Sequence, residues 1–332
     1  MIQDKFKSSK KMIGIEIGSD TLKLAVCIGD AVAEMAVKRL PENLIREGRV
    51  TAPTALTNFI KDMLKEHGLR PGPCAFVLPP QVVIAHHVTM PLMSEQELKL
   101  NLPFEFRDFV GKDAEKYEYD YSVVRVNEKS IELYAAAVPK DVVESYYDIF
   151  KKAGLTMKVA IPHEMAWLNL VVRAKNEPKC LAIVDVGQHA TRVDIFLDDN
   201  YVMGKDIEFG GQLFDEAIAA NQRVDAYIAR SRKESNMDNV LSLDCCSDVA
   251  MSIAVEVMKV VAFYNNTYAD EGNKLTDIYY CGGSSVIESL RTAILKSTNL
   301  AMHNIRRLIN LHGDDSALPL ACAIAVGAAV QQ

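Results

Sequence analysis

One short pattern occurs twice in this chain and constrains the fold more than any other feature. The first copy, IGIEIGSDTLKLAVC, covers residues 13–27, and the second, LAIVDVGQHATRVDIFLDDNYV, covers residues 181–202. In both, apolar residues alternate with period two on either side of a polar turn, which predicts a β-hairpin. Both copies also have the same order of features: an acidic residue, any residue, a glycine, a polar turn and then a second strand. Because the copies lie about half a chain length apart, we expect two related halves that each begin with this hairpin.

Two facing hairpins have a clear chemical use. Turn tips that present backbone N–H groups and hydroxyls bind phosphate groups, so a cleft between two such tips predicts a nucleotide site. The acids at the strand ends, Glu16 and Asp185, would hold Mg²⁺ through water, because that ion dehydrates reluctantly and prefers carboxylate oxygens. The alternative is that both acids merely end a strand at a turn.

A third glycine-containing junction follows in TDIYYCGGSSVIESLRTAIL. A short apolar run predicts a strand, Gly282 and Gly283 a turn, and the spacing of Ile287, Leu290 and Ile294 a helix. Backbone without side chains lets a flat ring and a ribose approach closely, so this junction predicts contact with adenosine. An ordinary strand-to-helix connection has the same pattern.

Composition argues against several classes of protein. A net charge of -7 and a pI of about 5.6, with scattered basic residues, argue against nucleic-acid binding. The seven cysteines include no C-x-x-C pair, which favours reduced thiols. The segment MIQDKFKSSKK lacks the apolar core of a signal peptide, and we expect a flexible lead-in over residues 1–11. The run ALPLACAIAVGAAVQQ is too short to cross a bilayer, so we expect no direct membrane insertion.

The three motifs, in this order, resemble those of the actin-like ATPase superfamily, which includes sugar kinases, chaperone ATPases, actin and FtsA. The resemblance implies an α/β, actin-like (ribonuclease H-like) duplicated fold with ATP and Mg²⁺ between two lobes. The halves are expected over residues 12–178 and 179–332. The segment Glu16-x-Gly18-Ser19-x-x-x-Lys23 is similar to the first phosphate motif, and Asp185-x-Gly187-x-x-x-Thr191 is similar to the second.

The resemblance also implies a set of ligand contacts. Glu16 and Asp185 would hold the metal. The nucleotide-binding residues would be Gly18, Ser19, Asp20, Thr21, Lys23, Gly187, Gln188, His189, Thr191, Gly210, Gly211, Glu256, Lys259, Gly282, Gly283 and Ser284.

Three acidic or basic residues expected at the site lie in segments that read as helices. Glu164 in IPHEMAWLNL resembles the acid that orients the attacking water in chaperone ATPases, and with Asp185 and Glu16 it forms the expected catalytic set. Its alternative role is an acid favoured by the dipole at a helix N-terminus. Glu256 and Lys259 share one helical face where the superfamily contacts the nucleoside, but an i,i+3 ion pair is the alternative.

An insertion expected over about residues 79–154 indicates which family of the superfamily the chain resembles. Ser94 and Glu97 form a capping box that predicts a helix start. The runs YDYSVVRV and SIELYAAAVPK read as paired strands, and DVVESYYDIFKKAGL reads as an amphipathic helix closed by Gly154. This small α+β insertion, with its MPLMSEQEL and AAVPK segments, resembles that of the PilM family, the cytoplasmic actin-like component of type IV pilus assembly. The run of small residues near the end of the sequence resembles the terminal helix of the same family.

This resemblance implies an ATP-binding scaffold of a type IV pilus or related secretion platform. A membrane protein, PilN, would place its short cytosolic N-terminal segment in a groove beside the insertion and recruit the chain to the inner face of the membrane. Other assembly-platform proteins are expected partners. The alternatives are a phosphotransferase or ATP hydrolase of the same fold, or an FtsA-like filament. Glu16 in place of the usual Asp, and Gln188-His189 in place of glycines, favour at most slow ATP hydrolysis.

Overall fold

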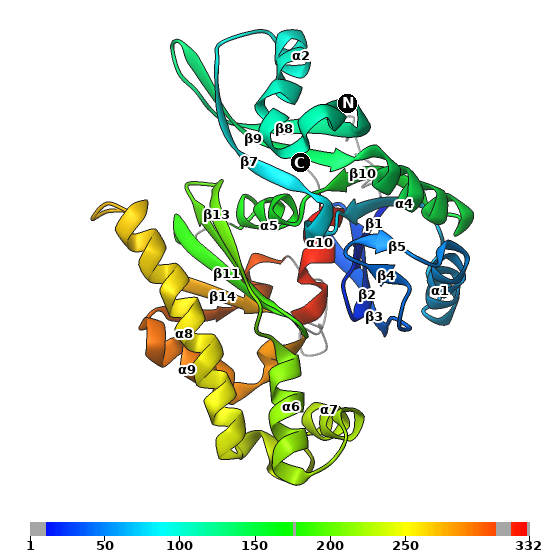
Figure 1. Cartoon of the computed structure of the whole chain (residues 1–332), viewed down its shortest axis with the longest axis vertical. Helices are drawn as coiled ribbons and strands as arrows, with labels where there is room; N and C mark the ends of the chain where they lie inside the picture. The colour runs from blue at the N-terminus through cyan, green and yellow to red at the C-terminus, as the bar shows by residue number, and fades with distance from the viewer. Residues whose placement is uncertain (1–10, 175–176, 310–319, 331–332) are drawn as a thin grey trace, which may run out of the picture.

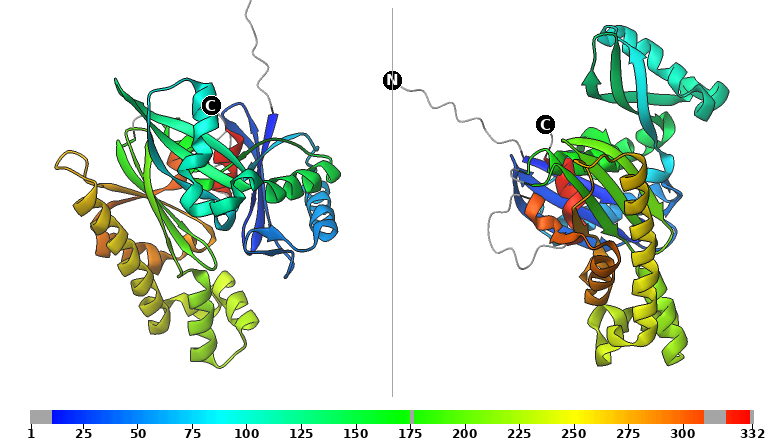
Figure 2. Two further views of the ribbon diagram at one scale, coloured as in Figure 1. Left: turned by 45° about the horizontal axis from the view of Figure 1, so that its top comes forward. Right: turned by 90° about the vertical axis from the view of Figure 1, so that its left-hand side faces the viewer.

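The computed structural model describes residues 11–174, 177–309 and 320–330. All but the last residue of the lead-in expected over residues 1–11 lies outside these ranges. The described chain forms two lobes side by side, each built on a five-stranded sheet (Figure 1). A smaller subdomain projects at the end of the molecule opposite to α6 and α7 (Figure 2).

The first sheet has the strand order β10-β6-β1-β2-β3. Its strands are β1 (Lys11–Ile17), β2 (Thr21–Ile28), β3 (Ala31–Arg39), β6 (Pro73–Val77) and β10 (Thr156–Ile161). The first three pair antiparallel, whereas β6 and β10 add in parallel. A two-stranded hairpin of β4 (Ile45–Arg46) and β5 (Arg49–Val50) precedes the helix α1 (Pro53–Glu66). This helix and α4 (Lys140–Lys152) pack on one face of the sheet.

The second sheet has the order β13-β12-β11-β14-β15 and the same pattern of directions. Its strands are β11 (Cys180–Val186), β12 (Thr191–Leu197), β13 (Asn200–Ile207), β14 (Asp277–Cys281) and β15 (Ala301–Asn304). The helices of this lobe are α6 (Gly211–Gln222), α7 (Ala226–Ser235), α8 (Asp244–Thr267) and α9 (Glu288–Thr298). Two equal sheet topologies in one chain confirm the expected duplicated α/β fold.

Two helices pack between the lobes. They are α5 (His163–Val171) and α10 (Ala323–Ala329), and they share one hydrophobic core with both sheets (Figure 1). A Cβ at Gly14 would clash with the carbonyl oxygen of Ala325, and a Cβ at Gly327 would clash with that of Ala166. The small-residue run near the end of the sequence therefore allows close backbone contact between α10, β1 and α5.

The inserted subdomain has its own core around Leu98, Leu102 and Phe106. Its elements are β7 (Ile84–Pro91), α2 (Glu95–Glu105), α3 (Arg107–Val110), β8 (Tyr117–Val126) and β9 (Ser130–Pro139), with strand order β7-β9-β8. The capping box at Ser94 and the pairing of β8 with β9 are confirmed. The helix DVVESYYDIFKKAGL, expected within this insertion, is α4, and it packs on the first sheet instead because its apolar face contacts Phe76.

Short 3-10 turns connect several of these elements: η1 (Pro80–Val82), η2 (Gly111–Lys116), η3 (Met237–Ser242), η4 (Gly283–Val286), η5 (Ile305–Leu308) and η7 (Leu320–Cys322). All seven cysteines lie within the described ranges, and none is in a disulfide. Among the described helices, none combines the length and the apolar character that a membrane crossing requires.

Candidate functional site

The two duplicated hairpins have the same register. Glu16 pairs with Lys23 across β1 and β2, and Asp185 pairs with Arg192 across β11 and β12. Each hairpin therefore places an acid and a cation opposite each other just before its turn. The sequence copies are thus also copies in backbone geometry.

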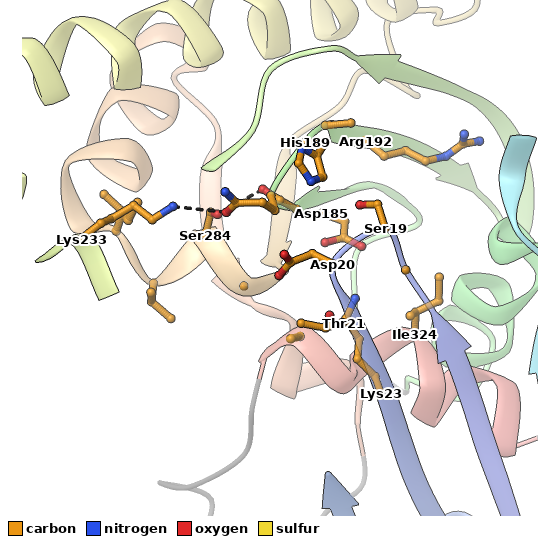
Figure 3. A pocket seen from close by; sticks show the side chains of 18 of the residues that line it. Ser19, Asp20, Thr21, Lys23, Asp185, His189, Arg192, Lys233, Ser284 and Ile324 are labelled. Carbon is orange, nitrogen blue, oxygen red and sulfur yellow. Dashed lines mark hydrogen bonds between the residues drawn. The ribbon is translucent and has the colours of Figure 1, made fainter. Parts of the chain in front are cut away.

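The turns match as well. The N–H of Gly18 donates to the carbonyl of Thr21 over 2.9 Å, and the N–H of Gly187 donates to the carbonyl of Ala190 over 2.9 Å. Each turn leaves two residues at its tip, Ser19-Asp20 in the first hairpin and Gln188-His189 in the second. Both tips border one cavity of about 1430 Å³ between the lobes (Figure 3).

The cavity brings together most of the residues expected at a nucleotide site. The lining contains Glu16, Gly18, Ser19, Asp20, Thr21, Lys23, Asp185, Gly187, Gln188, His189, Gly283 and Ser284. It does not contain Glu164, Thr191, Gly210, Gly211, Glu256, Lys259 or Gly282.

A compact charge group forms one wall of the cavity. The Nζ of Lys23 lies 2.8 Å from Oε1 of Glu16, and burial raises the pKa of both Glu16 and Asp185. Burial favours the neutral amine of Lys23, but the two carboxylates outweigh it and raise its pKa. The other oxygen of Glu16 is buried without a hydrogen-bond partner among the described residues. This oxygen is free to accept from a water molecule bound to a cation.

The glycine pairs support the second tip from behind. Gly282 has φ +89°, and a Cβ there would clash with Oδ1 of Asp185. The N–H of Gly211 donates to the carbonyl of Gly187 over 2.9 Å, and the hydroxyl of Ser284 donates to that same carbonyl over 3.1 Å. Gly282 and Gly211 therefore permit close packing around the second tip. Gly283 and Ser284, which follow Gly282, line the cavity.

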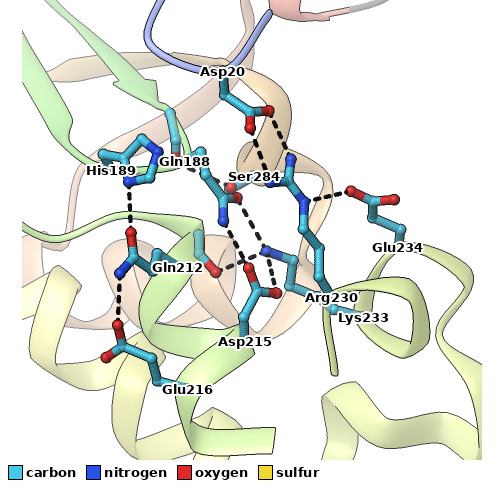
Figure 4. A network of polar contacts seen from close by, with 12 residues as sticks. Asp20, Gln188, His189, Gln212, Asp215, Glu216, Arg230, Lys233, Glu234 and Ser284 are labelled. Carbon is cyan, nitrogen blue, oxygen red and sulfur yellow. Dashed lines mark hydrogen bonds and ion pairs between the residues drawn. The ribbon is translucent and has the colours of Figure 1, made fainter. Parts of the chain in front are cut away.

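Lys233 fixes the side chain of Gln188 at the second tip (Figure 4). Its Nζ donates to the carbonyl of Gly211 over 2.7 Å and to Oε1 of Gln188 over 3.2 Å, and lies 2.8 Å from Oδ1 of Asp215. The amide of Gln188 in turn donates to Asp215 over 2.6 Å. The tip is therefore held by a closed set of polar contacts with α6 and α7.

Part of the cavity wall comes from residues of α8 and α9 that were not expected at the site from the sequence. They include Ala250, Met251, Thr292 and Ala293. Small residues on the facing helices leave room for a flat ring, but such pairs occur in many packed helices, so no specific signal in the sequence marks them.

The residues expected to contact the nucleoside lie elsewhere on α8. Glu256 and Lys259 form an ion pair of 2.6 Å further along that helix and do not line the cavity. This arrangement matches the alternative considered for them from the sequence, the i,i+3 pair.

Glu164 and Thr191 are buried beside the cavity and do not line it. The hydroxyl of Thr191 donates to the carbonyl of Phe209 over 2.8 Å. Glu164 accepts a hydrogen bond of 2.5 Å from the hydroxyl of Tyr134 and lies 2.9 Å from Nδ1 of His163. Its carboxylate is thus already engaged by groups of the protein.

His163 does line the cavity, and its ring is held between two acids. Nδ1 faces Glu164, and Nε2 lies 3.1 Å from Oδ2 of Asp194. Burial favours the neutral ring, but the two carboxylates outweigh it and raise the pKa of His163 to about 9. Burial likewise raises the pKa of Glu164, but His163 and Tyr134 outweigh it and lower that pKa to about 2.

Within the described ranges, no three or more His, Cys, Asp or Glu side chains are grouped so that they could hold a metal ion. A cation between Glu16 and Asp185 would therefore complete its coordination with water and phosphate oxygens, as Mg²⁺ commonly does.

Known proteins share both the sequence pattern and the fold. A family model described as type IV pilus assembly protein PilM matches residues 14–314. The structure of a PilM-PilN type IV pilus biogenesis complex matches with a TM-score of 0.82 and 20% identity, covering 98% of this chain and 100% of that chain.

Two further structures show the actin-like fold more distantly. The ethanolamine utilization protein EutJ from Carboxydothermus hydrogenoformans matches with a TM-score of 0.61 and 13% identity, over 97% of this chain and 89% of that chain. MreB 5 of Spiroplasma citri bound to AMPPNP matches with a TM-score of 0.53 and 12% identity, over 96% and 95% of the two chains. Because the PilM family model spans most of the sequence, the chain belongs to the PilM family of type IV pilus assembly proteins.

Proposed function

We propose that this protein is a nucleotide-binding scaffold of type IV pilus assembly that binds the cytosolic N-terminal segment of a PilN-like membrane protein. The observation that carries the proposal is the match with the PilM-PilN complex over 98% of this chain and 100% of that chain. A match of this extent includes the inserted subdomain, beside which we place the peptide groove.

The cavity supports ATP as the ligand. Both hairpin tips line it, the first with the hydroxyl of Ser19 and the second with the side chains of Gln188 and His189, and turns of this kind commonly present backbone N–H groups to a phosphate chain. The part of its wall from α8 and α9 has small and apolar side chains that suit adenine. The structure of MreB 5 bound to AMPPNP, which shares the fold, supports the same kind of ligand.

Mg²⁺ fits the residues present. Glu16 and Asp185 would hold it, and their charges explain why a cation is needed when phosphates enter the same cavity. The ion would offset the repulsion between these carboxylates and the phosphates. The unpartnered oxygen of Glu16 provides the second observation in favour of this site.

We expect ATP hydrolysis to be slow, so that the nucleotide stabilises the scaffold. The acid expected to orient the attacking water, Glu164, is bonded to Tyr134 and His163 and does not line the cavity. A general base must lie within hydrogen-bond reach of the proton that it takes. Steady-state phosphate release far below one turnover per second is expected, and many turnovers per second would favour the alternative of a true hydrolase.

Recruitment to the membrane would depend on the partner. No described helix has the length and apolarity needed for a membrane span. By analogy with the PilM-PilN complex, we place the protein in the cytoplasm, at the inner face of the membrane, held by the segment of the PilN-like protein.

Fluorescence anisotropy with a labelled peptide tests the partner. The probe is the N-terminal cytosolic segment of the PilN-like protein encoded in the same genome, and a scrambled peptide of equal composition is the control. Saturable binding in the micromolar range, about -8 kcal/mol, is expected for the native order of residues alone. Equal binding of both peptides, or none at millimolar protein, would contradict the scaffold proposal.

Thermal unfolding tests the nucleotide. Mg-ATP at a hundredfold excess over its dissociation constant should stabilise the folded protein by about 2.7 kcal/mol. An unchanged melting temperature in millimolar Mg-ATP would remove the nucleotide from the proposal and leave the peptide result unaffected.

A further inference from the structure

The first hairpin tip carries an acid that should repel phosphate. Asp20 lies at the tip and lines the cavity, so a bound phosphate chain would come close to its carboxylate. Two negative charges close together disfavour phosphate binding unless a positively charged group compensates their repulsion. The structure provides that group across the cleft.

Arg230, on α7 of the second lobe, binds both oxygens of Asp20 (Figure 4). Its Nη1 donates to Oδ1 over 2.9 Å and its Nη2 donates to Oδ2 over 2.6 Å. Only about a fifth of either side chain is exposed, 19% for Asp20 and 20% for Arg230. Burial raises the pKa of the Asp20 carboxyl, but its bonds to Arg230 outweigh burial and lower the pKa, so Asp20 is ionised at neutral pH.

The pair belongs to a ring of four alternating charges. Glu234 accepts from Nε of Arg230 over 3.0 Å and from Nη2 of Arg39 over 3.2 Å. Nε of Arg39 lies 3.9 Å from Oδ1 of Asp20 and closes the ring. Asp20 and Arg39 come from the first lobe, and Arg230 and Glu234 come from the second, so the ring joins the lobes beside the cavity.

The fork of an arginine accepts a phosphate in the same bidentate geometry in which it accepts a carboxylate. We propose that Asp20 substitutes for a phosphate before nucleotide binds and that Arg230 exchanges this carboxylate for a phosphate of the bound nucleotide. Arg230 is then a ligand-binding residue that favours nucleotides with more phosphates, and Asp20 is its internal competitor. This inference rests on the proposed nucleotide site.

Two variants distinguish this exchange from an ion pair with a merely structural role. In Asp20→Asn, Arg230 loses its competitor and one negative charge leaves the cavity, so ATP should bind more tightly. In Arg230→Gln, the phosphates lose a ligand and face an unpaired carboxylate, so ATP should bind more weakly. A pair that only holds the lobes together would change ATP affinity in the same direction in both variants.

Arg39→Gln is the matched control. It removes the contact with Glu234 between the lobes and the 3.9 Å contact with Asp20, but it leaves the bidentate pair of Asp20 with Arg230 in place. ATP affinity should therefore stay close to that of the wild type. A second variant at the tip, Asp20→Ser, keeps a polar turn residue and should behave like Asp20→Asn, so the result does not depend on the folding of one protein.

Isothermal titration with adenosine, Mg-ADP and Mg-ATP at fixed ionic strength measures these differences. For Mg-ATP we expect binding about tenfold tighter in Asp20→Asn and about tenfold weaker in Arg230→Gln, as for the gain or loss of one charge-assisted contact. Both effects should be absent for adenosine, which has no phosphate. Equal changes in both variants, or equal changes for adenosine and ATP, would overturn the exchange. Failure of the wild type to bind any of the three would instead reject the nucleotide site itself.

Discussion

Replacing His163 by glutamine should change how stability depends on pH. The ring is buried, with Nδ1 2.9 Å from Oε2 of Glu164 and Nε2 3.1 Å from Oδ2 of Asp194. Ionised carboxylates only accept hydrogen bonds, so both ring nitrogens must carry a proton and the ring is an imidazolium. Glutamine has no charge, so Glu164 loses its cationic partner and Asp194 keeps only its ion pair with Arg192.

The magnitude follows from the pKa of His163. It is about 9 in the folded protein, against an ordinary value of 6.5. At about 1.36 kcal/mol for each pH unit, this difference corresponds to a contribution of about 3 kcal/mol to the free energy of unfolding. Because the folded pKa is the higher one, the contribution is fully present below pH 6.5 and is lost as the pH rises through about 9.

Urea denaturation between pH 6 and pH 10 tests this reasoning. The wild type should exceed His163→Gln in free energy of unfolding by several kcal/mol at pH 6, and the gap should narrow by about 3 kcal/mol by pH 10. His67→Gln, at an exposed position after α1, is the control and should follow the wild type throughout. A constant gap between the wild type and His163→Gln over this range would refute the assignment of an imidazolium.

Three further predictions concern the cavity and the packing of α10 between the lobes. Asp185→Ala should remove the gain in ADP affinity that Mg²⁺ provides, whereas Lys23→Ala should weaken ADP binding with or without Mg²⁺, as calorimetry in the presence and absence of the metal would measure. Ala250→Trp should fill the space between α8 and α9 and weaken ATP binding at least about a hundredfold while peptide binding is unchanged, a result that direct titration of both ligands would check. Gly14→Val should lower the free energy of unfolding by about 3 kcal/mol or more in urea denaturation, because its Cβ would clash with the backbone of α10.

The hairpins could be predicted because their signals are local. Alternating apolar residues fix which strand face is buried, and the glycine that follows the acid fixes where each turn falls. The same holds for the capping box at Ser94, whose two partners lie three residues apart. For these elements a short window of sequence contains the interacting groups.

The rest of the cavity depends on packing between distant segments. Arg230 and Lys233 reach the two tips only because α7 folds back toward the first lobe. Helical periodicity shows which residues share a face, but it does not show how far along a helix a neighbouring cavity extends. That is why Glu256 was expected in the cavity wall, where the structure has Ala250 instead.

The duplication conserves backbone geometry more closely than charge. Lys23 and Arg192 occupy equivalent positions opposite an acid, but Arg192 is tied to Asp194 and Asp206 at 3.0 Å each, whereas Lys23 is held through Glu16. The cation of the second hairpin is therefore largely neutralised by the wall of its own lobe. In the proposed nucleotide site, positive charge for a phosphate chain would come from Lys23 on the first hairpin and, once Asp20 releases it, from Arg230 on α7. The cations of the two hairpins are therefore not equivalent, and the proposed exchange at Arg230 would be a main determinant of how many phosphates the site prefers.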